Sequence, residues 1–377
     1  MRSPLSPSPL QVWAVEDTSV QLTWGALPAG EVSARSGEAR TVVDHQGGPG
    51  ALDLAGLAPG TDHRIDVAWD GGRTSLAATT APALPGAPLC RIATISDLHL
   101  GSDHWGASKL MRDRSGHHVP FPVRCATAAI DEAAAWGAEL LVIKGDAAHH
   151  QAPEHFELVG QLVDRVPDLP VLLVPGNHEV NGHSGHPMPA KVGRRGAPYV
   201  RQAACVDLAG LRVIVGDTTI DGKGIGTLDR VADDIVELAR VGNQPYFLGL
   251  HHQLQPRRLP DHYPPGLAAP ASTGLLDALA AANPKGFVSS GHTHRNRWRR
   301  HGPLGVSEVA STRDWPGVWA GYVVHEGGIR QVVRRTAAPD AITWTEYSRR
   351  ALLGLWGWWA AGPRDQRCVT HRWLPQP

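Results

Sequence analysis

The pattern of apolar and polar positions divides the chain into two main parts. In residues 9–82 the two kinds of residue alternate over short stretches such as SVQLTW (19–24) and HRIDVAW (63–69), separated by turns rich in glycine and proline. Alternation with a period of two buries one face of a strand and exposes the other. We therefore predict that residues 9–82 form a small all-β sandwich domain, followed by a Pro/Ala linker at 83–88.

From residue 89 onward, apolar strands alternate with segments of helical period. Strands are expected at CRIATIS (90–96), AELLVIK (138–144), PVLLVP (170–175), LRVIV (211–215) and YFLGL (246–250). Apolar residues recur at helical spacing in 154–166 and 228–241. This alternation predicts an α/β layered domain over residues 89–336. The remaining segment, 337–377, holds five of the thirteen tryptophans, and we expect it to dock on the rest of the protein.

Composition narrows the class of protein. The chain has 36 Lys and Arg against 36 Asp and Glu, so its charge does not favour a nucleic acid or an anionic membrane as partner. Its four cysteines lie far apart without a C-x-x-C pair, which indicates a reducing compartment. The N-terminal residues lack the apolar stretch of a secretion signal, and the longest apolar run, 351–362, is too short for a membrane span. We expect a cytoplasmic protein; these patterns leave its oligomeric state open.

At five places an apolar strand ends on side chains that can bind a metal ion. They are Asp97 with His99, Asp146, Asn177, His251, and His292 with His294. Ligands of open α/β folds bind beyond the carboxyl ends of the strands, so we expect these side chains to converge. Residues i and i+2 of a strand point to the same side, which would pair Asp97 with His99 and His292 with His294.

These seven side chains offer only oxygen and nitrogen donors. Seven donors exceed what one four-coordinate ion needs, whereas two five- or six-coordinate ions that share a bridge would use them all. Imidazole and carboxylate without thiolate favour divalent transition-metal ions such as Mn, Fe or Zn. Two such ions, about 3.5–4 Å apart, form the arrangement that stabilises an in-line displacement at phosphorus.

In these motifs the chain resembles the calcineurin-like metallophosphoesterases. The family pattern appears in order as DLH (97–99), GD (145–146), GNHE (176–179), HH (251–252) and GHTH (291–294). The resemblance covers about 250 residues. It implies an α/β fold in which two sheets pack face to face between helices, a four-layer α-β-β-α sandwich that here follows the small all-β domain.

The resemblance also implies a role for each motif residue. Asp97, His99, Asp146 and His294 would bind the first metal ion; Asp146, Asn177, His251 and His292 would bind the second, with Asp146 as the bridge. A metal-bridging hydroxide would attack phosphorus. His178 follows Asn177 directly and in a continuing strand would point elsewhere, so it is expected to act as the catalytic residue at the leaving-group oxygen.

Other residues near the motifs leave alternatives open. The family pattern favours His251 over His252 as the ligand, although spacing alone does not separate them. His149 resembles a histidine of the DNA-repair nuclease branch, and a role in substrate binding competes with a supporting or surface role. Arg295 is a candidate phosphate contact or part of a solvated strand face. The long polar insertion 101–123 is either a lid over the site or a disordered loop.

The N-terminal region resembles a fibronectin type III domain. Trp24 in LTW (22–24) matches the core tryptophan of that family, and LAPGT (57–61) matches its turn before a late strand. His63 stands where the family usually has a tyrosine. A spacer or docking role is expected for this region.

The leading hypothesis is a dinuclear-metal phosphoesterase that hydrolyses a phosphodiester or a phosphomonoester. By family analogy, a small phosphodiester is mildly preferred as substrate. Two alternatives remain: a metal-dependent nuclease of the same superfamily, which would need a basic groove and is not favoured by the neutral charge, and a catalytically silent scaffold. The complete ligand set argues against the scaffold.

Overall fold

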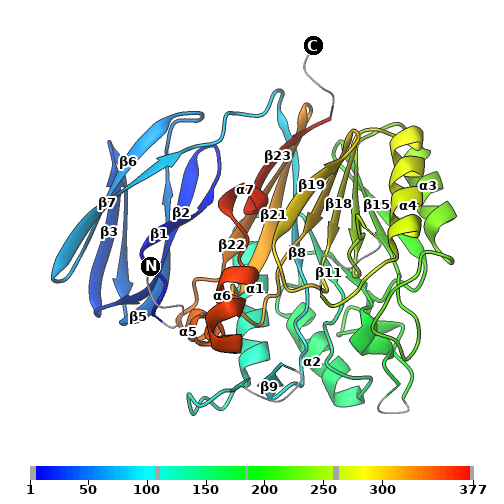
Figure 1. Ribbon diagram of the computed structural model, residues 1–377, viewed down its shortest axis with the longest axis horizontal. Helices are drawn as coiled ribbons and strands as arrows, with labels where there is room; N and C mark the ends of the chain where they lie inside the picture. The colour runs from blue at the N-terminus through cyan, green and yellow to red at the C-terminus, as the bar shows by residue number, and fades with distance from the viewer. Residues whose placement is uncertain (1–5, 107–110, 183–185, 258–262, 374–377) are drawn as a thin grey trace.

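The computed structural model describes residues 6–106, 111–182, 186–257 and 263–373 (Figure 1). A small all-β region, drawn in blue, packs against a larger α/β body. The C-terminal helices and the last strand lie between these two parts.

The all-β region consists of two antiparallel sheets with strand orders β1-β2-β5 and β4-β3-β6-β7. Its core, which includes Leu22, Trp24 and Ile65, is formed by the inward-facing residues of the alternating pattern. The strands are β1 (Gln11–Val15), β2 (Ser19–Leu27), β3 (Gly30–Ser36), β4 (Ala39–His45), β5 (Gly48–Ala55), β6 (Asp62–Trp69) and β7 (Gly72–Thr79).

Two six-stranded mixed sheets form the centre of the body. The first sheet is, in spatial order, β12 (Val171–Val174), β11 (Leu140–Lys144), β8 (Pro88–Ile95), β21 (Val318–His325), β22 (Gly328–Arg335) and β23 (Cys368–Arg372). The second sheet is β15 (Ala203–Leu208), β16 (Leu211–Gly216), β17 (Tyr246–Leu250), β18 (Gly286–Ser290), β20 (Leu304–Glu308) and β19 (Arg297–His301). In each sheet the strands that lead to the motifs run parallel: β8, β11 and β12 in the first, β17 and β18 in the second.

Helices cover the outer faces of both sheets. Helices α1 (Phe121–Ala135) and α2 (Pro153–Asp164) pack on the first sheet, and α3 (Ala232–Arg240) and α4 (Ala269–Ala282) pack on the second. In Figure 1, α3 and α4 are seen at the right edge of the molecule. The predicted α/β class and the four-layer α-β-β-α arrangement, preceded by an all-β region, are confirmed.

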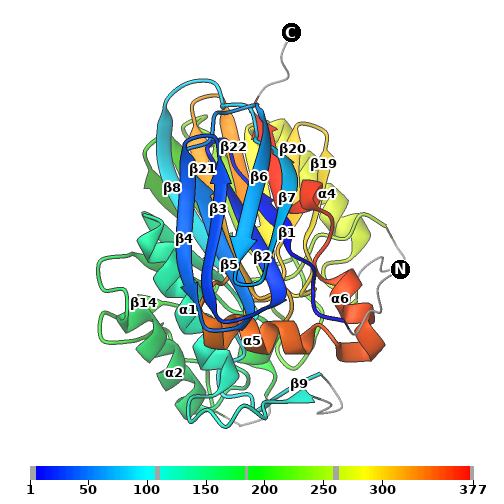
Figure 2. The ribbon, with the colours of Figure 1, turned by 90° about the vertical axis from the view of Figure 1, so that its left-hand side faces the viewer.

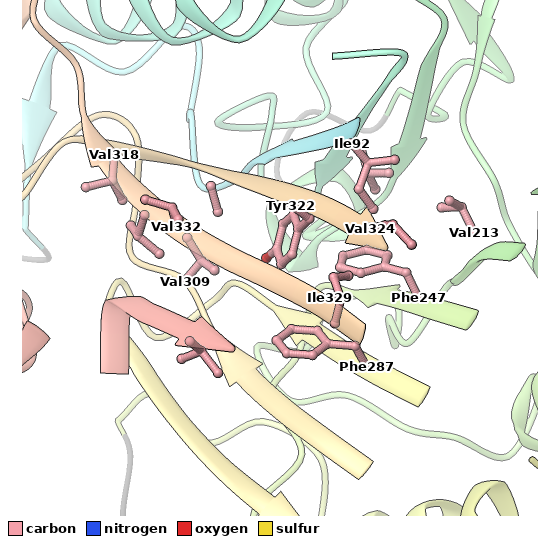
Figure 3. Packing of buried hydrophobic residues seen from close by; sticks show 14 of the residues in the cluster. Ile92, Val213, Phe247, Phe287, Val309, Val318, Tyr322, Val324, Ile329 and Val332 are labelled. Atoms are coloured by element: carbon pink, nitrogen blue, oxygen red, sulfur yellow. The ribbon is translucent and has the colours of Figure 1, made fainter. Parts of the chain in front are cut away.

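The two sheets bury a continuous apolar core between them. Ile92 and Tyr322 of the first sheet lie opposite Phe247 and Phe287 of the second (Figure 3). The Tyr322 ring packs edge-on against the Phe247 ring, with centroids 4.8 Å apart. Because both faces of each sheet are buried, the strands have continuous apolar runs instead of alternation.

One of the two predicted helices begins later than its apolar pattern. The helix expected over 154–166 is α2, whereas the helix expected over 228–241 begins only at Ala232. Leu228 and Val231 are buried in the turn before it. Two acidic residues, Asp233 and Asp234, occupy the first turn of α3, where the helix dipole stabilises negative charge.

The C-terminal segment docks on the body as expected. Helix α5 (Pro339–Ser348) packs on α1, and β23 extends the first sheet. Trp344 and Trp373 are buried, whereas Trp358 is 78% exposed. Between α5 and β23 lie the short elements η2 (Ala351–Gly354), α6 (Leu355–Trp359) and α7 (Arg364–Arg367).

The all-β region is attached through an aromatic and charged interface, and Figure 2 shows its sheets in front of the body. Trp13 of β1 is buried, and its indole donates a hydrogen bond to the carbonyl of Val333. The Arg367 guanidinium lies 3.8 Å from the Trp13 ring, and Asp17 pairs with Arg330 at 2.9 Å. Such buried contacts fix the all-β region on the first sheet.

None of the helices in the described residues is both long and apolar enough to cross a membrane. All four cysteines are free thiols.

Candidate metal centre

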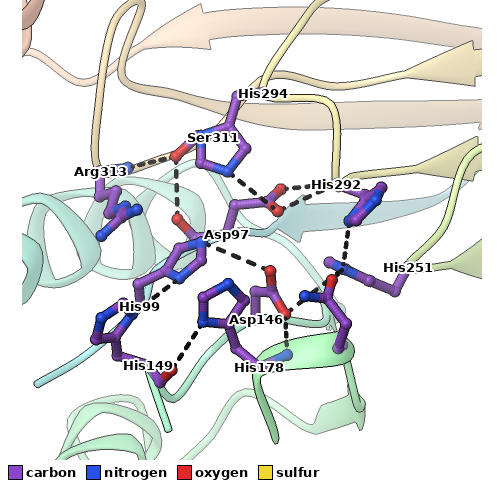
Figure 4. A network of polar contacts seen from close by, with 12 residues as sticks. Asp97, His99, Asp146, His149, His178, His251, His292, His294, Ser311 and Arg313 are labelled. Atoms are coloured by element: carbon purple, nitrogen blue, oxygen red, sulfur yellow. Dashed lines mark hydrogen bonds and ion pairs between the residues drawn. The ribbon is translucent and has the colours of Figure 1, made fainter. Parts of the chain in front are cut away.

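The seven predicted donors come together at the carboxyl ends of the parallel strands (Figure 4). Each strand ends before its donor is reached: β8 stops at Ile95, β11 at Lys144 and β18 at Ser290. The donors therefore lie in the loops just beyond the two sheets, where both sheets present their strand ends to the same space.

The pairs at i and i+2 arise from turns and not from extended strands. Asp97, His99, Asp146, His292 and His294 all have positive φ, between 46° and 67°. The expectation that a continuing strand would align each pair is wrong in its mechanism, although both members of each pair face the site. Left-handed backbone at a residue other than glycine costs about 1–3 kcal/mol and clusters at functional sites.

Glycines let the loops approach the donors closely. A Cβ on Gly145 would lie 2.4 Å from Nδ1 of His251, and one on Gly176 would lie 2.2 Å from Oδ1 of Asp146. Both distances are far below van der Waals contact. The glycines of the GD and GNHE motifs are thus required by the packing of the site.

The donors form two groups that share Asp146. In the first, Nε2 of His99 lies 3.6 Å from Oδ2 of Asp146, and Nε2 of His294 lies 3.5 Å from Oδ1 of Asp97. In the second, Nε2 of His251 lies 3.5 Å from Oδ1 of Asp146. The two oxygens of the Asp146 carboxylate therefore face different groups.

The second group is completed by an amide and a further imidazole. Oδ1 of Asn177 lies 3.2 Å from Nε2 of His251, and Nδ1 of His292 lies 3.2 Å from the same nitrogen. The remaining ring nitrogens bond outward: His251 donates through Nδ1 to the carbonyl of Lys144, and His292 donates through Nε2 to the carbonyl of Pro265. Such outer contacts orient the rings and set their tautomers.

The donor set fits two divalent cations. Nε2 of His99 is fully enclosed and has no hydrogen-bond partner in the described part of the chain, yet it faces the Asp146 carboxylate. A buried imidazole nitrogen without a partner is costly unless a cation takes its lone pair. Trios of these donors, such as Asp97 with His99 and His294, have ligand atoms within 4.8 Å of one another, as ligands of one divalent ion would.

The electrostatics of the centre differ from one donor to the next. Burial opposes ionisation of Asp146, but His251, His178 and His292 outweigh it and lower the pKa of Asp146 to about 2. Burial, reinforced by the charge of Arg313, lowers the pKa of His99 well below its ordinary value. Asp146 and His99 are thus held in the forms that bind metal. Burial lowers the pKa of His294, but Asp314 and Asp97 outweigh it and raise that pKa, so His294 would have to release a proton on binding a metal ion.

The sequence profile of the calcineurin-like phosphoesterase family matches residues 90–296, more than half of the chain. The chain belongs to this family. Membership supports a metal-dependent phosphoester hydrolase. No curated protein is significantly similar to the chain in sequence.

The chain is similar to several solved structures. A dimetal phosphatase from Danio rerio superposes with a TM-score of 0.50 at 11% identity, covering 66% of this chain and 97% of its own. A purple acid phosphatase from yellow lupin (Lupinus luteus) seeds has a TM-score of 0.43 at 10% identity, covering 88% of this chain and 72% of its own. At these identities the comparison with the Danio rerio protein shows the fold of the metallophosphoesterase body and nothing more specific.

In this metallophosphoesterase, His178 lies in the 3-10 helix η1 (Asn177–Val180) and not in a continuing strand. Its backbone N–H donates to Oδ1 of Asp146 at 2.9 Å, and its Nδ1 donates to the carbonyl of His149 at 2.8 Å. The ring centroid is 4.4 Å from that of His99. The helical turn, and not the alternation of a strand, directs His178 and Asn177 to different partners.

The two candidate substrate residues lie in different surroundings. Nδ1 of His149 is 3.4 Å from Nδ1 of His99, so His149 stands behind a predicted ligand. The Arg295 guanidinium lies 4.3 Å from the Trp359 ring of the C-terminal segment.

Asp217, at the end of β16, pairs with Arg201 at 3.1 Å and accepts hydrogen bonds from Thr219, which are structural contacts.

The insertion 101–123 is ordered where it is described. It contains the hairpin β9 (His104–Trp105) and β10 (Met111–Arg112), and α1 begins at Phe121. Trp105 and Met111 are buried against α1 and α5. A second small hairpin, β13 (Lys191–Val192) with β14 (Ala197–Pro198), packs near α2.

Three further residues support the centre and were missed in the sequence. Glu179 accepts hydrogen bonds from the backbone N–H groups of Asp146, Ala148 and Gly176, which holds two of the motif loops together. Asp314 accepts a hydrogen bond from Nδ1 of His294 at 2.7 Å. Arg313, beside it, is buried. The GNHE motif could have indicated Glu179, but no sequence pattern marks the loop 309–317.

Asp314→Asn is expected to weaken metal binding by about 10–100-fold, because a carboxylate behind a ligating histidine fixes the ring and raises its basicity. Calorimetric titration of the metal-free protein with Mn²⁺ would measure the effect. Asp277→Asn is a matched control, since it removes the same kind of contact, to His301 at 2.6 Å, away from the centre. Unchanged Mn²⁺ affinity in Asp314→Asn would show that the contact with His294 has no role in metal binding.

Proposed function

We propose that this chain is a dinuclear-metal phosphoesterase. One ion would be bound by Asp97, His99, Asp146 and His294, and the other by Asp146, Asn177, His251 and His292. The observation that carries the proposal is the Asp146 carboxylate, whose two oxygens face the two donor groups at 3.6 Å and 3.5 Å. His251 is preferred to His252 because Nε2 of His251 faces the Asp146 carboxylate at 3.5 Å, whereas Nδ1 of His252 contacts the hydroxyl of Thr218 at 2.8 Å.

Two bound divalent ions would supply an activated water nucleophile and stabilise charge on the phosphoryl oxygens. The chain itself would contribute a histidine that is held in position and can transfer a proton. The bond from Nδ1 of His178 to the carbonyl of His149 leaves Nε2 as the nitrogen that can exchange a proton with the leaving-group oxygen. Because η1 and the Asp146 carboxylate hold the backbone of His178, its ring is oriented before substrate binds.

The substrate class follows less directly. The family pattern favours small phosphodiesters, and a phosphomonoester is the alternative. A nuclease of the same superfamily remains a candidate only because His149 resembles a histidine of the DNA-repair nuclease branch. The complete donor set and the presence of His178 argue against a silent scaffold.

A paired assay tests the proposal. Protein reconstituted with Mn²⁺ is expected to hydrolyse bis(p-nitrophenyl) phosphate or p-nitrophenyl phosphate, and a chelator should abolish the rate. Preference for the diester would lead to cyclic nucleotides, glycerophosphodiesters and short nucleic acids as substrates to test. Preference for the monoester would lead to nucleotides, phosphoproteins and sugar phosphates. A rate that persists without metal, or no rate on either ester, would contradict the proposal.

We also propose that the all-β region is a fibronectin type III-like domain. A three-stranded sheet facing a four-stranded sheet, with Trp24 buried between them, supports this relationship. The four free thiols support a cytoplasmic location.

A further inference from the structure

A buried arginine, Arg313, stands beside the metal centre, and none of the described residues forms an ion pair with it. Arg313 is 6% exposed, and its Nε and Nη1 atoms have no hydrogen-bond partner in the described part of the chain. No carboxylate of the described residues lies within 4.0 Å of its guanidinium, since the neighbouring Asp314 pairs with His294 instead. Burial of a cation is costly. The carboxylates of Asp314, Asp146 and Asp97 offset part of this cost, but none is within ion-pair distance, so the guanidinium can still accept a further anion.

The backbone of Arg313 is fixed on both sides. Its N–H donates to Oγ of Ser311, and that hydroxyl donates to the carbonyl of Asp97 at 3.0 Å. Its carbonyl accepts a hydrogen bond from the indole of Trp344 at 2.7 Å. These contacts direct the side chain toward the imidazole of His99, as Figure 4 shows. The guanidinium is therefore held at the edge of the first donor group.

Arg313 lies in a largely buried environment, in which Asp314 and Trp105 are also buried. The indole of Trp105, from the insertion, donates a hydrogen bond to Oδ2 of Asp314, the same atom that receives the bond from His294. The Trp105 ring packs on Trp356 of the C-terminal segment, with centroids 5.0 Å apart. Insertion and C-terminal segment thus meet over the loop 309–317. In such a buried setting a charge-assisted hydrogen bond is stronger than in water.

We propose that Arg313 binds a non-bridging oxygen of the substrate phosphoryl group and thereby favours phosphomonoesters; this inference rests on the proposed function. With two divalent ions in place, the three carboxylates of Asp97, Asp146 and Asp314 are outweighed by positive charge, which favours a dianion. A monoester phosphate has three non-bridging oxygens, enough for two ions and a guanidinium, whereas a diester has two. The preference for diesters expected from the family pattern would then be reversed.

The test compares Arg313→Gln and Arg313→Lys with wild type, after Mn²⁺ loading. Binding of orthophosphate is measured by calorimetry, together with metal content, thermal midpoint and kcat/KM on p-nitrophenyl phosphate and its bis ester. Arg165→Gln is the control, because Arg165 forms an ion pair with Asp131 at the surface, away from the centre. Hydrogen bonds to charged groups contribute enough that Arg313→Gln should lose about 10–100-fold in orthophosphate affinity and in monoester kcat/KM. The diester rate should change much less, and metal content should not change.

Arg313→Lys keeps the charge but loses the planar pair of donors, so we expect partial recovery. Lower metal content in either folded variant, or an equal loss on both esters, would overturn the inference and make Arg313 a counter-ion of the carboxylates. If wild type is active and Arg313→Gln matches it, the inference alone fails. If wild type hydrolyses neither ester, the proposed function fails, and orthophosphate binding that is the same in both proteins would reject Arg313 as a phosphate contact as well.

Discussion

Asp146→Asn is expected to abolish turnover and to remove both metal ions. The two oxygens of Asp146 face His99 of one donor group and His251 of the other, and asparagine of nearly the same volume has neither the charge nor the second ligating oxygen. Metal ions supply several kcal/mol of transition-state stabilisation, so the rate should fall by at least about 10³-fold. Metal content by mass spectrometry and the rate on the better of the two nitrophenyl esters would measure the two effects.

Asp217→Asn is the matched control for this variant. Asp217 is also a buried carboxylate at the end of a strand, but Arg201 and Thr219 are its partners. It should keep both ions. If Asp146→Asn retained two tightly bound ions, the assignment of Asp146 as the bridge would be wrong.

His178→Ala is expected to keep both metal ions and to lose turnover. His178 bonds through Nδ1 to a backbone carbonyl, so its loss removes no donor from either group, whereas general acid–base catalysis typically contributes about 10²–10⁴-fold. Metal content and kcat, measured on the same preparation, separate the two roles. The loss of kcat should be smaller for an ester with a better leaving group, since that oxygen needs a proton less.

His301→Ala, which changes a histidine outside the centre, should alter neither quantity. Loss of metal from His178→Ala would identify His178 as a ligand. Full activity with full metal content would instead assign the proton transfer to another group, and His149, which stands behind His99, would be the next to substitute.

The ligand candidates could be found in the sequence because strand order and residue type carry the information. Five motifs follow five buried strands, and the parallel arrangement of β8, β11 and β12 brings their ends to one edge. The α/β class was predictable because apolar strands alternate with segments of helical period. The four-layer arrangement was expected only from the resemblance to the family. The helices α1 and α4 were not predicted, since alanine-rich segments give a weak helical pattern.

The local geometry could not be predicted from alternation. Asp97 and His99 face the same side because both adopt left-handed backbone conformations. The side chains of Asn177 and His178 point in different directions because a 3-10 helix begins at Asn177. Such conformations are costly when isolated, and the tertiary contacts of the loops stabilise them. A short-range sequence pattern reports only the intrinsic backbone preference of each residue, and for Asp and His that preference is not the left-handed conformation found here.

By itself the sequence determined the α/β class, the positions along the chain of the strands that precede the motifs, and the chemistry of the donors, because periodicity and side-chain type are local properties of the chain. Only the tertiary structure decided which residues surround those donors. Asp314 and Arg313 reach the centre from a loop that follows the last motif, and Trp105 and Trp356, far apart in the sequence, pack together beside it. Contacts between segments so far apart depend on how the sheets, the insertion and the C-terminal segment pack, and no local pattern encodes that packing.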